Sequence, residues 1–481
     1  MNHSVIRYIL VNVILFEGVF MIPSIIVALI YGEKEGFTLA AVMAACIAFG
    51  FIGRCFKPKS TTFYAKEGFV TVALAWMIMS IIGAIPFYVT GSIPNYIDAV
   101  FETMSGFTTS GGTILTDVEH LSKSIQFWRL FTHWLGGMGV LVLILAILPL
   151  SGSYNLYLMK AESAGPSVGK FVPKIKDTAK ILYSIYLGIT IIEIIALCIT
   201  GLPLYDAMTL TFSTVGTGGF GLLNDSIGSY SMTTGCVIIV FMLICSINFN
   251  LYFLLLKGKI KDVFKSEELR LFLIIVIVAT LAVFFNIRKL YSGTTESLYH
   301  SLFQVASIIS TTGFSTVDFN RWPDFSKNVL IIITLIGACA GSTGGGFKVS
   351  RVLILYKSIK NELYTLVHPR AVKKVHVDGK ILSSSLIHSV GIYLAIYVII
   401  FGISCILLSL DGYLNFESVF TSVAANLNNV GPGFNLVGPM DGYAKLSYFS
   451  KIVLIFDMLI GRLELIPVLI LFTPRTWKKL D

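Results

Sequence analysis

Charged residues are scarce in this sequence. Asp, Glu, Lys and Arg make up only 13% of its 481 residues, whereas 55% are hydrophobic and the mean hydropathy is +0.81. Soluble domains carry about 25% charged residues, so this composition excludes an ordinary soluble protein. It predicts a protein that crosses a membrane several times.

Clusters of reactive side chains are also missing. The seven cysteines are scattered, mostly within apolar segments, without the spacing of a disulfide framework or a zinc site. His, Asp and Glu do not gather at one membrane face with the spacing of a metal site or an acid–base pair. A polytopic membrane enzyme, such as a lipid-modifying transferase, is therefore a remote alternative. We expect no enzyme activity and no organic cofactor.

A cleavable signal peptide is not evident either. The first apolar stretch, residues 6–31, is long enough to span a bilayer and is followed at once by a second, so we expect it to stay as a transmembrane helix. The net charge of +9 comes from Lys and Arg gathered in loops between apolar segments, as the positive-inside bias produces. This bias predicts cytoplasmic N- and C-termini and no nucleic-acid partner.

Four short polar steps that contain glycine recur along the chain, each between two long apolar segments. They are Thr109-Ser110-Gly111, Thr217-Gly218-Gly219, Thr311-Thr312-Gly313 and Asn429-Val430-Gly431. Glycine can aim successive carbonyl groups at one axis, and Thr, Ser or Asn adds oxygen without bulk. One such run alone is more often a simple turn. Four in matching context predict a ring of carbonyl groups, which is how potassium-selective pores replace the hydration shell of the ion.

The steps divide the chain into a predicted all-α polytopic membrane protein. Residues 1–66 form an N-terminal two-helix hairpin, with helices at 5–31 and 37–55. Four repeats of helix, re-entrant pore loop and helix follow around a central pore, in residues 67–160, 161–265, 266–380 and 381–481. Their expected elements are 68–90, 98–112 and 124–150; 181–201, 206–220 and 232–256; 271–287, 296–314 and 327–358; and 384–409, 417–433 and 449–472.

The second repeat offers two candidate steps, one starting at Thr214 and the other at Thr217. Asp206 precedes Gly219 by 13 residues, the spacing between Asp98 and the glycine of the first step, so the triplet at Thr217 is favoured. The other two steps also follow an acid, Glu296 and Glu417. An acid that opens a short helix leaves the negative helix end aimed at the glycine step, which favours a cation there.

A glycine-rich run interrupts the apolar segment after the third step. It reads Gly341-Ser342-Thr343-Gly344-Gly345-Gly346. A phosphate-binding loop would need Gly-Lys-Ser/Thr after a strand, but Phe347 separates the last glycine from Lys348. Each glycine destabilises a helix by about 1 kcal/mol relative to alanine. We therefore predict an intramembrane loop within the 327–358 segment.

Arg462 lies inside the last apolar segment, where a charge costs roughly 2.5–3.5 kcal/mol. It must face the bundle interior or water. An ion pair, for example with Asp457, is one interpretation. The preferred one is that Arg462 holds the glycine-rich loop or sets an electrostatic barrier. His133 and Glu193 are also intramembrane ionisable residues. His133 could relay protons or simply pack, and the role of Glu193 stays open.

The chain resembles the TrkH subunits of bacterial Trk potassium uptake systems, within the Trk/Ktr/HKT superfamily. The resemblance rests on the four glycine steps, on HWLGGMGV at 133–140, GSTGGGFK at 341–348 and GRLEL at 461–465, and on the N-terminal hairpin, which Ktr-type subunits lack. It implies a potassium ion as the transported ion, a selectivity filter at the four steps, and a gate formed by residues 341–346 with Arg462.

The resemblance also implies a homodimer in the lipid of a bacterial inner membrane, docked on a cytoplasmic TrkA-like nucleotide-binding ring. Residues 151–180 and 360–380 would offer the docking face. The steps depart from the family at Ser110-Gly111-Gly112, commonly Thr-Gly-Ala, and at Gly216-Thr217, commonly Ala-Ile, which leaves the fine selectivity open. A sodium-coupled Ktr-like transporter is the closer alternative, and passive or coupled flux is not decided.

Overall fold

A computed structural model describes the chain except for residues 57, 59–63, 140–174, 372, 464 and 478–481. The N-terminal hairpin consists of α1 (His3–Phe20), α2 (Ile22–Tyr31) and α3 (Glu35–Arg54). Proline in the first turn of α2 separates it from α1, and Gly32, with φ +69°, ends α2 and turns the chain toward α3.

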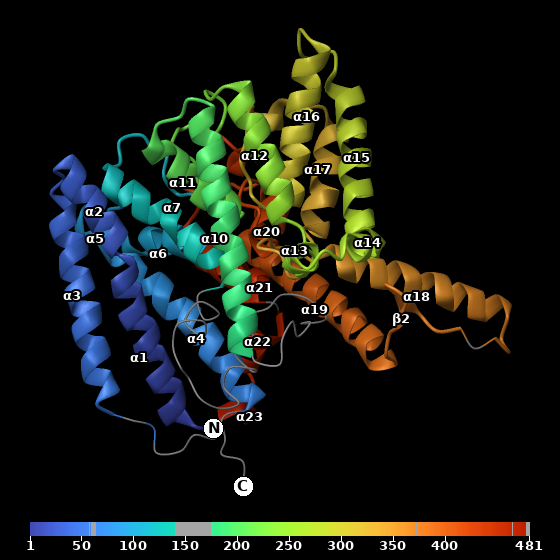
Figure 1. The fold of residues 1–481 in the computed structure, drawn as a ribbon, viewed down its shortest axis with the longest axis horizontal. Coiled ribbons are helices and arrows are strands. Elements are labelled where there is room, and N and C mark those ends of the chain that lie inside the picture. Colours follow the sequence, from blue (N-terminus) through green and yellow to red (C-terminus); the bar gives the residue numbers. More distant parts are fainter. Residues whose placement is uncertain (57, 59–63, 140–174, 372, 464, 478–481) are drawn as a thin grey trace.

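A helix of 12 or 16 residues, here called the short helix, recurs four times after this hairpin, each time between two other helical segments (Figure 1). The first occurrence comprises α4 (Ala65–Gly83), α5 (Ile85–Val89), α6 (Tyr96–Phe107) and α7 (Lys123–Gly137). The second comprises α10 (Ile175–Ile199), α11 (Leu204–Val215), α12 (Met232–Cys245), α13 (Phe249–Leu256) and α14 (Ile260–Lys265).

The third and fourth occurrences follow the same plan. The third has α15 (Glu267–Ile287), α16 (Thr294–Ile309), the 3-10 turn η1 (Phe319–Arg321), α17 (Asp324–Ile336), α18 (Val349–Val367), β1 (His376–Val377) and β2 (Lys380–Ile381). The fourth has α19 (Ser384–Leu408), α20 (Phe416–Leu427), η2 (Asn435–Val437), α21 (Tyr448–Leu463), α22 (Leu465–Leu471) and α23 (Pro474–Trp477).

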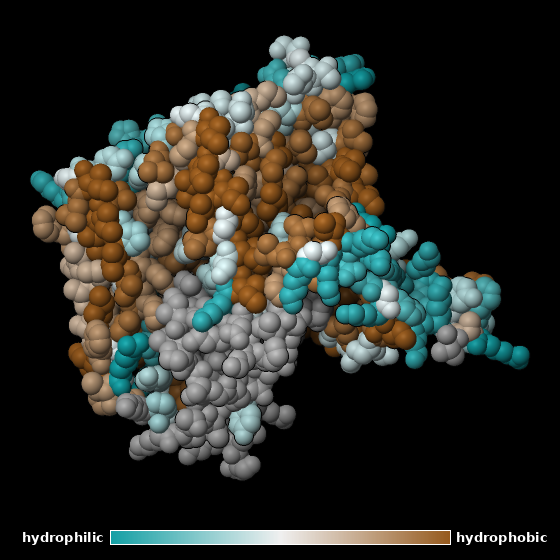
Figure 2. Space-filling model, viewed as in Figure 1, coloured by the Kyte–Doolittle hydropathy of each residue, from teal (hydrophilic) through white to brown (hydrophobic). Residues whose placement is uncertain are grey.

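In the described part of the chain, six spans are long and apolar enough to cross a membrane, or seven if α12 and α13 count as one broken span. The six are α1 with α2, α3, α4 with α5, α10 from Thr178, α15 and α19. Figure 2 shows a broad hydrophobic face over the outer helices, bordered by hydrophilic residues along the upper edge. Exposed apolar residues on α10, such as Leu187, Ile191 and Ile195, belong to this lipid-facing surface.

The second helices of the repeats correct the sequence prediction. Residues 232–256 are not one helix, because α12 and α13 meet at 91°. The Asn248 side chain caps α13, and the Phe249 N–H donates to Gly341 O over 3.0 Å. The predicted helix at 449–472 agrees with α21 and α22, which lie on either side of residue 464, and α7 ends at Gly137, with residues 140–150 outside the described part. The small hairpin of β1 and β2 was not predicted.

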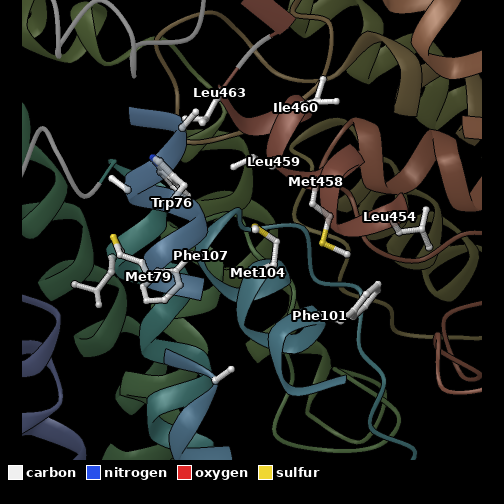
Figure 3. Packing of buried hydrophobic residues seen from close by; sticks show 14 of the residues in the cluster. Trp76, Met79, Phe101, Met104, Phe107, Leu454, Met458, Leu459, Ile460 and Leu463 are labelled. Atoms are coloured by element: carbon white, nitrogen blue, oxygen red, sulfur yellow. The ribbon is translucent and has the colours of Figure 1, made fainter. Parts of the chain in front are cut away.

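The four short helices pack in a ring that follows the chain. Each contacts the second helix of the preceding occurrence: α11 contacts α7, α16 contacts α12, α20 contacts α17, and α6 contacts α21. Figure 3 shows the contact that closes the ring, where Leu454 and Met458 of α21 pack in one buried cluster with Phe101 and Met104 of α6. The fourth occurrence therefore lies beside the first.

Candidate ion-binding site and gate

Four short helices, α6, α11, α16 and α20, point their C-terminal ends at the glycine steps. Each carries an acid in its first turn, namely Asp98, Asp206, Glu296 and Glu417. These acids complement the positive helix ends, and the four negative ends face the common axis. The arrangement stabilises a cation at that axis.

The same backbone hydrogen bond forms at the point where the chain leaves each short helix. The middle residue of every step donates its N–H to the carbonyl five residues back, over 2.8–2.9 Å. The four pairs are Ser110 with Ser105, Gly218 with Ser213, Thr312 with Ser307, and Val430 with Ala425. The four segments therefore share one local backbone structure although their side chains differ.

In each step, the first and third residues have left-handed backbone angles. The first residue of each step has a positive φ, 55° at Thr109, 54° at Thr217, 61° at Thr311 and 54° at Asn429. The third is a glycine with a φ of 79°, 85°, 85° or 95° in the same order. Left-handed angles cost a residue with a side chain about 1–2 kcal/mol. Strain repeated at four equivalent places points to a functional requirement. In the second repeat the pattern falls on the triplet at Thr217, since Gly216 has φ −70°.

The glycines close the ring of steps. A Cβ atom added to Gly111, Gly219 or Gly313 would overlap the carbonyl oxygen of the middle residue of the next step, and one added to Gly431 would meet that of Ser110 in the first step. No side chain fits at these positions. The carbonyl groups of all four steps therefore surround one axis in chain order, beneath a cavity lined by the residues that follow each step.

The glycine-rich loop lies directly under this ring. It runs from Gly337, with φ +73°, to Lys348, and separates α17 from α18. The N–H of Gly345 donates to the hydroxyl of Thr311 over 2.6 Å, and a Cβ atom at Gly345 would meet Asn428 O. The buried Lys348 ammonium donates back to Gly344 O within the loop.

Arg462 joins this loop to the ring. Its Nη1 donates to Thr343 O over 2.7 Å and to the hydroxyl of Thr109 over 3.1 Å. Its Nη2 donates to the carbonyl oxygens of Gly136 and Gly137, over 2.5 and 2.6 Å. Asp457 accepts a hydrogen bond from Ser404 over 2.7 Å. The guanidinium thus links the end of α7, the loop and α21.

Comparison with known proteins decides the family. The family model TrkH, described as cation transport protein, matches residues 35–479. The chain belongs to the TrkH family. The TrkH protein of the Salmonella typhimurium Trk potassium uptake system is 37% identical, with 99% of each chain covered. The TrkG protein of the Escherichia coli K12 system is 33% identical, with 95% of each covered.

A solved structure agrees with this assignment to the TrkH family. The crystal structure of the potassium transporter TrkH from Vibrio parahaemolyticus has a TM-score of 0.88 at 34% identity, covering 99% of this chain and 100% of that one. The predicted helical, multi-pass membrane fold is confirmed. Since TrkH-family members are cation transport proteins, the enzyme alternative is set aside.

The structure shows the surroundings of the two intramembrane residues His133 and Glu193. His133 lies 2.7 Å from Gly106 O through Nδ1, and its Nε2 accepts the Phe220 N–H over 3.3 Å, so the neutral ring with a proton on Nδ1 satisfies both contacts. Packing is favoured over proton relay. Glu193 is fully buried, and its carboxyl oxygens make no hydrogen bond within the described residues.

A buried ion pair behind the ring was missed from the sequence. Arg129 of α7 contacts Glu102 of α6, with Nε and Oε1 2.6 Å apart, and both side chains are buried. Two ionisable residues inside apolar segments are a recognisable signal of function. In the sequence, however, no pattern joins Glu102 to Arg129, because the two residues lie on different helices.

Proposed function

We propose that this chain takes up potassium across the inner membrane of a bacterium through the ring of glycine steps. The observation that carries the proposal is the backbone shared by the four steps, which closes into a ring at the negative ends of four helices. Membership of the TrkH family supports it. The ion-binding residues would be the carbonyl and hydroxyl groups of 109–111, 217–219, 311–313 and 429–431, one step from each proposed repeat.

Rubidium uptake into proteoliposomes tests this function. We expect uptake driven by an inside-negative potential, with potassium competing and sodium competing far less. Liposomes without protein provide the control. Absence of uptake above that control by both the unmodified protein and the Arg462→Ala variant, which lacks the arginine of the proposed gate, would contradict the proposal. A requirement for sodium would favour the Ktr-like alternative.

The second element of the proposal is the gate. The loop 341–346 and Arg462 lie beneath the ring and are joined by the hydrogen bond to Thr343. A guanidinium at this position adds a positive charge below the ion-binding ring, which opposes the passage of a cation. We propose that loop and arginine together close the pathway at rest, and that a cytoplasmic partner releases them.

The proposed partners are a second copy of this chain and a TrkA-like nucleotide-binding ring. Helix α18 supports the dimer, because it projects from the bundle (Figure 1) and exposes Tyr356, Ile359, Leu363, Leu366 and Val367. Replacing Ile359 and Leu363 by Asp should convert the dimer to a monomer in light-scattering measurements. Asp at the exposed Leu290 and Leu410, which lie outside the candidate spans, is the matched control. Most of the proposed docking face at 151–180 lies outside the described residues.

Orientation completes the proposal, with both termini and the basic loops in the cytoplasm. Cysteines introduced at the exposed Ser229 and Lys360 test it, in a background that lacks the exposed Cys55 and Cys236. A thiol reagent that cannot cross membranes should label position 229 from outside and position 360 only after permeabilisation. The reverse labelling would invert the topology.

A further inference from the structure

The segment that follows each glycine step needs a hydrogen-bonding anchor, because its backbone lies inside the protein near the ion path. In the first repeat the anchor comes from the repeat's own short helix. Glu102 of α6 accepts the Thr113 hydroxyl and the Ile114 N–H, each over 2.9 Å. The first outer segment is thus held in place by its own repeat.

The third and fourth repeats follow this rule. Gln304 and Ser307 of α16 donate to Phe314 O, over 3.3 and 2.6 Å. In the fourth repeat, the hydroxyl of Thr421 in α20 accepts the Phe434 N–H over 3.0 Å. Three of the four outer segments are therefore anchored from the short helix that precedes them.

The second repeat breaks the rule. Leu210 of α11 stands nine residues before its step glycine, where the first repeat has Glu102 and the third has Gln304. The Ser213 hydroxyl, in the place of Ser307, makes no hydrogen bond within the described residues. An apolar side chain at 210 offers neither donor nor acceptor. The anchor for the second outer segment must come from elsewhere.

Helix α7 of the first repeat supplies it. Three of its side chains, Gln126, Arg129 and His133, lie on one face of the helix, spaced by three and four residues. They bond successive residues of the second outer segment, namely Leu222 O at 3.1 Å, Gly221 O at 3.2 Å and the Phe220 N–H at 3.3 Å. One helix face thus follows three consecutive residues of the segment.

Arg129 is itself fixed in place. Its ion pair with Glu102 orients the guanidinium, whose carbon lies 3.6 Å from the centre of the Phe220 ring. Because Glu102 also anchors the first outer segment, the pair ties together the segments of two repeats. A planar guanidinium stacks on a ring while its fork of N–H groups donates to two acceptors in fixed directions, whereas a lysine ammonium is a point charge without that fork.

His133 fills the space behind the second step. Its ring lies where a side chain at Gly218 would be, so a Cβ atom there would overlap the imidazole. The middle residues of the other steps, Ser110, Thr312 and Val430, all carry side chains. His133 therefore substitutes for the missing side chain and supports the second step from α7.

We propose that Gln126, Arg129 and His133 are positioning residues that set the second quarter of the ring and thereby the preference for potassium over sodium. The inference rests on the proposed function, since it assigns these residues to the same ion-binding ring. They act through Phe220, Gly221 and Leu222. The second outer segment is then held by a helix of the neighbouring repeat, whereas the other three are held by the short helix of their own repeat.

The test uses Gln126→Leu and Arg129→Lys in the full chain, with a rescue variant. We expect the potassium-to-sodium permeability ratio to fall by about tenfold in each, equivalent to about 1.4 kcal/mol, while rubidium flux persists. Adding Leu210→Gln to Gln126→Leu installs the anchor found at Gln304 and should restore most of the ratio. Trp134→Phe is the control, because Trp134 on the same helix bonds Thr190 of α10 instead.

A second measurement does not depend on transport. Hydrogen exchange should speed up at residues 220–222 in Gln126→Leu and Arg129→Lys but not at 314–316. Unchanged exchange and an unchanged ratio, or equal changes in Trp134→Phe, would overturn the inference and leave α7 as a scaffold. Absence of rubidium uptake by both the unmodified protein and the Arg462→Ala variant would overturn the proposed function instead, and the exchange data would still decide whether α7 anchors the segment.

Discussion

The ring of glycine steps and the region just below it follow opposite plans. In the ring, four segments repeat the same hydrogen bonds and the same two positive φ angles. Below it, the second helices diverge. The helices α12 and α13 meet at 91°, and the loop from 337 to 348 separates α17 from α18. The arginine that bonds this loop, Arg462, lies in α21. The upper part is nearly fourfold, and the lower part is not.

The difference follows from what each part must do. An ion on an axis is held best by equal ligands at equal distances, so each repeat must contribute the same backbone. A barrier needs to close the axis only once, so one loop and one arginine suffice, and the other repeats are free to change. Symmetry within the ring and asymmetry below it therefore match the proposed separation of ion binding from gating.

The largest expected effect is a break in the ring's symmetry. Gly313→Ser places a side chain on a residue with φ +85° and against Val430 O. The strain of about 1–2 kcal/mol at one quarter, together with the overlap with Val430 O, should lower the potassium-to-sodium permeability ratio at least tenfold. Gly402→Ser, in open space on α19, is the control. Equal ratios for both variants in bilayer recordings would remove Gly313 from the filter.

The ring is also the part that the sequence predicted best. Its glycines, its acids and the register at Thr217 all appear as local patterns, because the shared backbone requires a glycine at the same place in each step. The corner between α12 and α13 leaves no such trace. Its apolar run predicts membrane insertion, whereas the bend depends on the Asn248 cap and on a bond to Gly341 from another helix.

The interaction partners of Arg462 show the same limit. A charge inside an apolar segment predicts that some partner exists. The sequence favoured the glycine-rich loop as that partner, but nothing in it indicated the end of α7. Thr343, Gly136 and Gly137 offer only backbone oxygens, so no side-chain pattern marks them. Contacts that depend on the packing of distant helices are the part that one sequence does not reveal.

The next effect in size concerns the lower region. Arg462→Ala removes hydrogen bonds from a charged donor, worth about 1.5–3 kcal/mol each. Basal rubidium uptake per inserted protein should rise by about tenfold or more. Deleting residues 344–346 should do the same, and both changes should weaken control by a cytoplasmic partner. The exposed Arg288→Ala serves as control. Flux equal to or below that of the unmodified protein in both folded variants would make the loop a structural kink.

A smaller effect is expected where the two regions touch. Thr311→Val keeps the shape of the third step but leaves the Gly345 N–H without its acceptor. An unmet buried donor costs about 1–3 kcal/mol, part of which water under the ring offsets, so basal uptake should rise severalfold. Thr334→Val, whose hydroxyl bonds only within α17, is the matched control. A change in selectivity without a change in basal flux would place Thr311 in the ring alone.

The smallest effect is expected where the loop of the proposed gate contacts α15. Glu268, at the start of α15, accepts the Ala340 N–H through Oε1 over 2.7 Å and so ties the loop to the first helix of its own repeat. Glu268→Gln keeps an acceptor oxygen and should change basal uptake little. Glu268→Ala removes the acceptor, and with a net hydrogen-bond value of about 0.5–1.5 kcal/mol uptake should rise roughly two- to tenfold. The exposed Asp262→Ala controls for the lost charge. If Glu268→Gln and Glu268→Ala raised uptake equally, the charge of Glu268 rather than its hydrogen bond would hold the loop. The charges of Arg462 and Glu268 would then both contribute to closing the lower region.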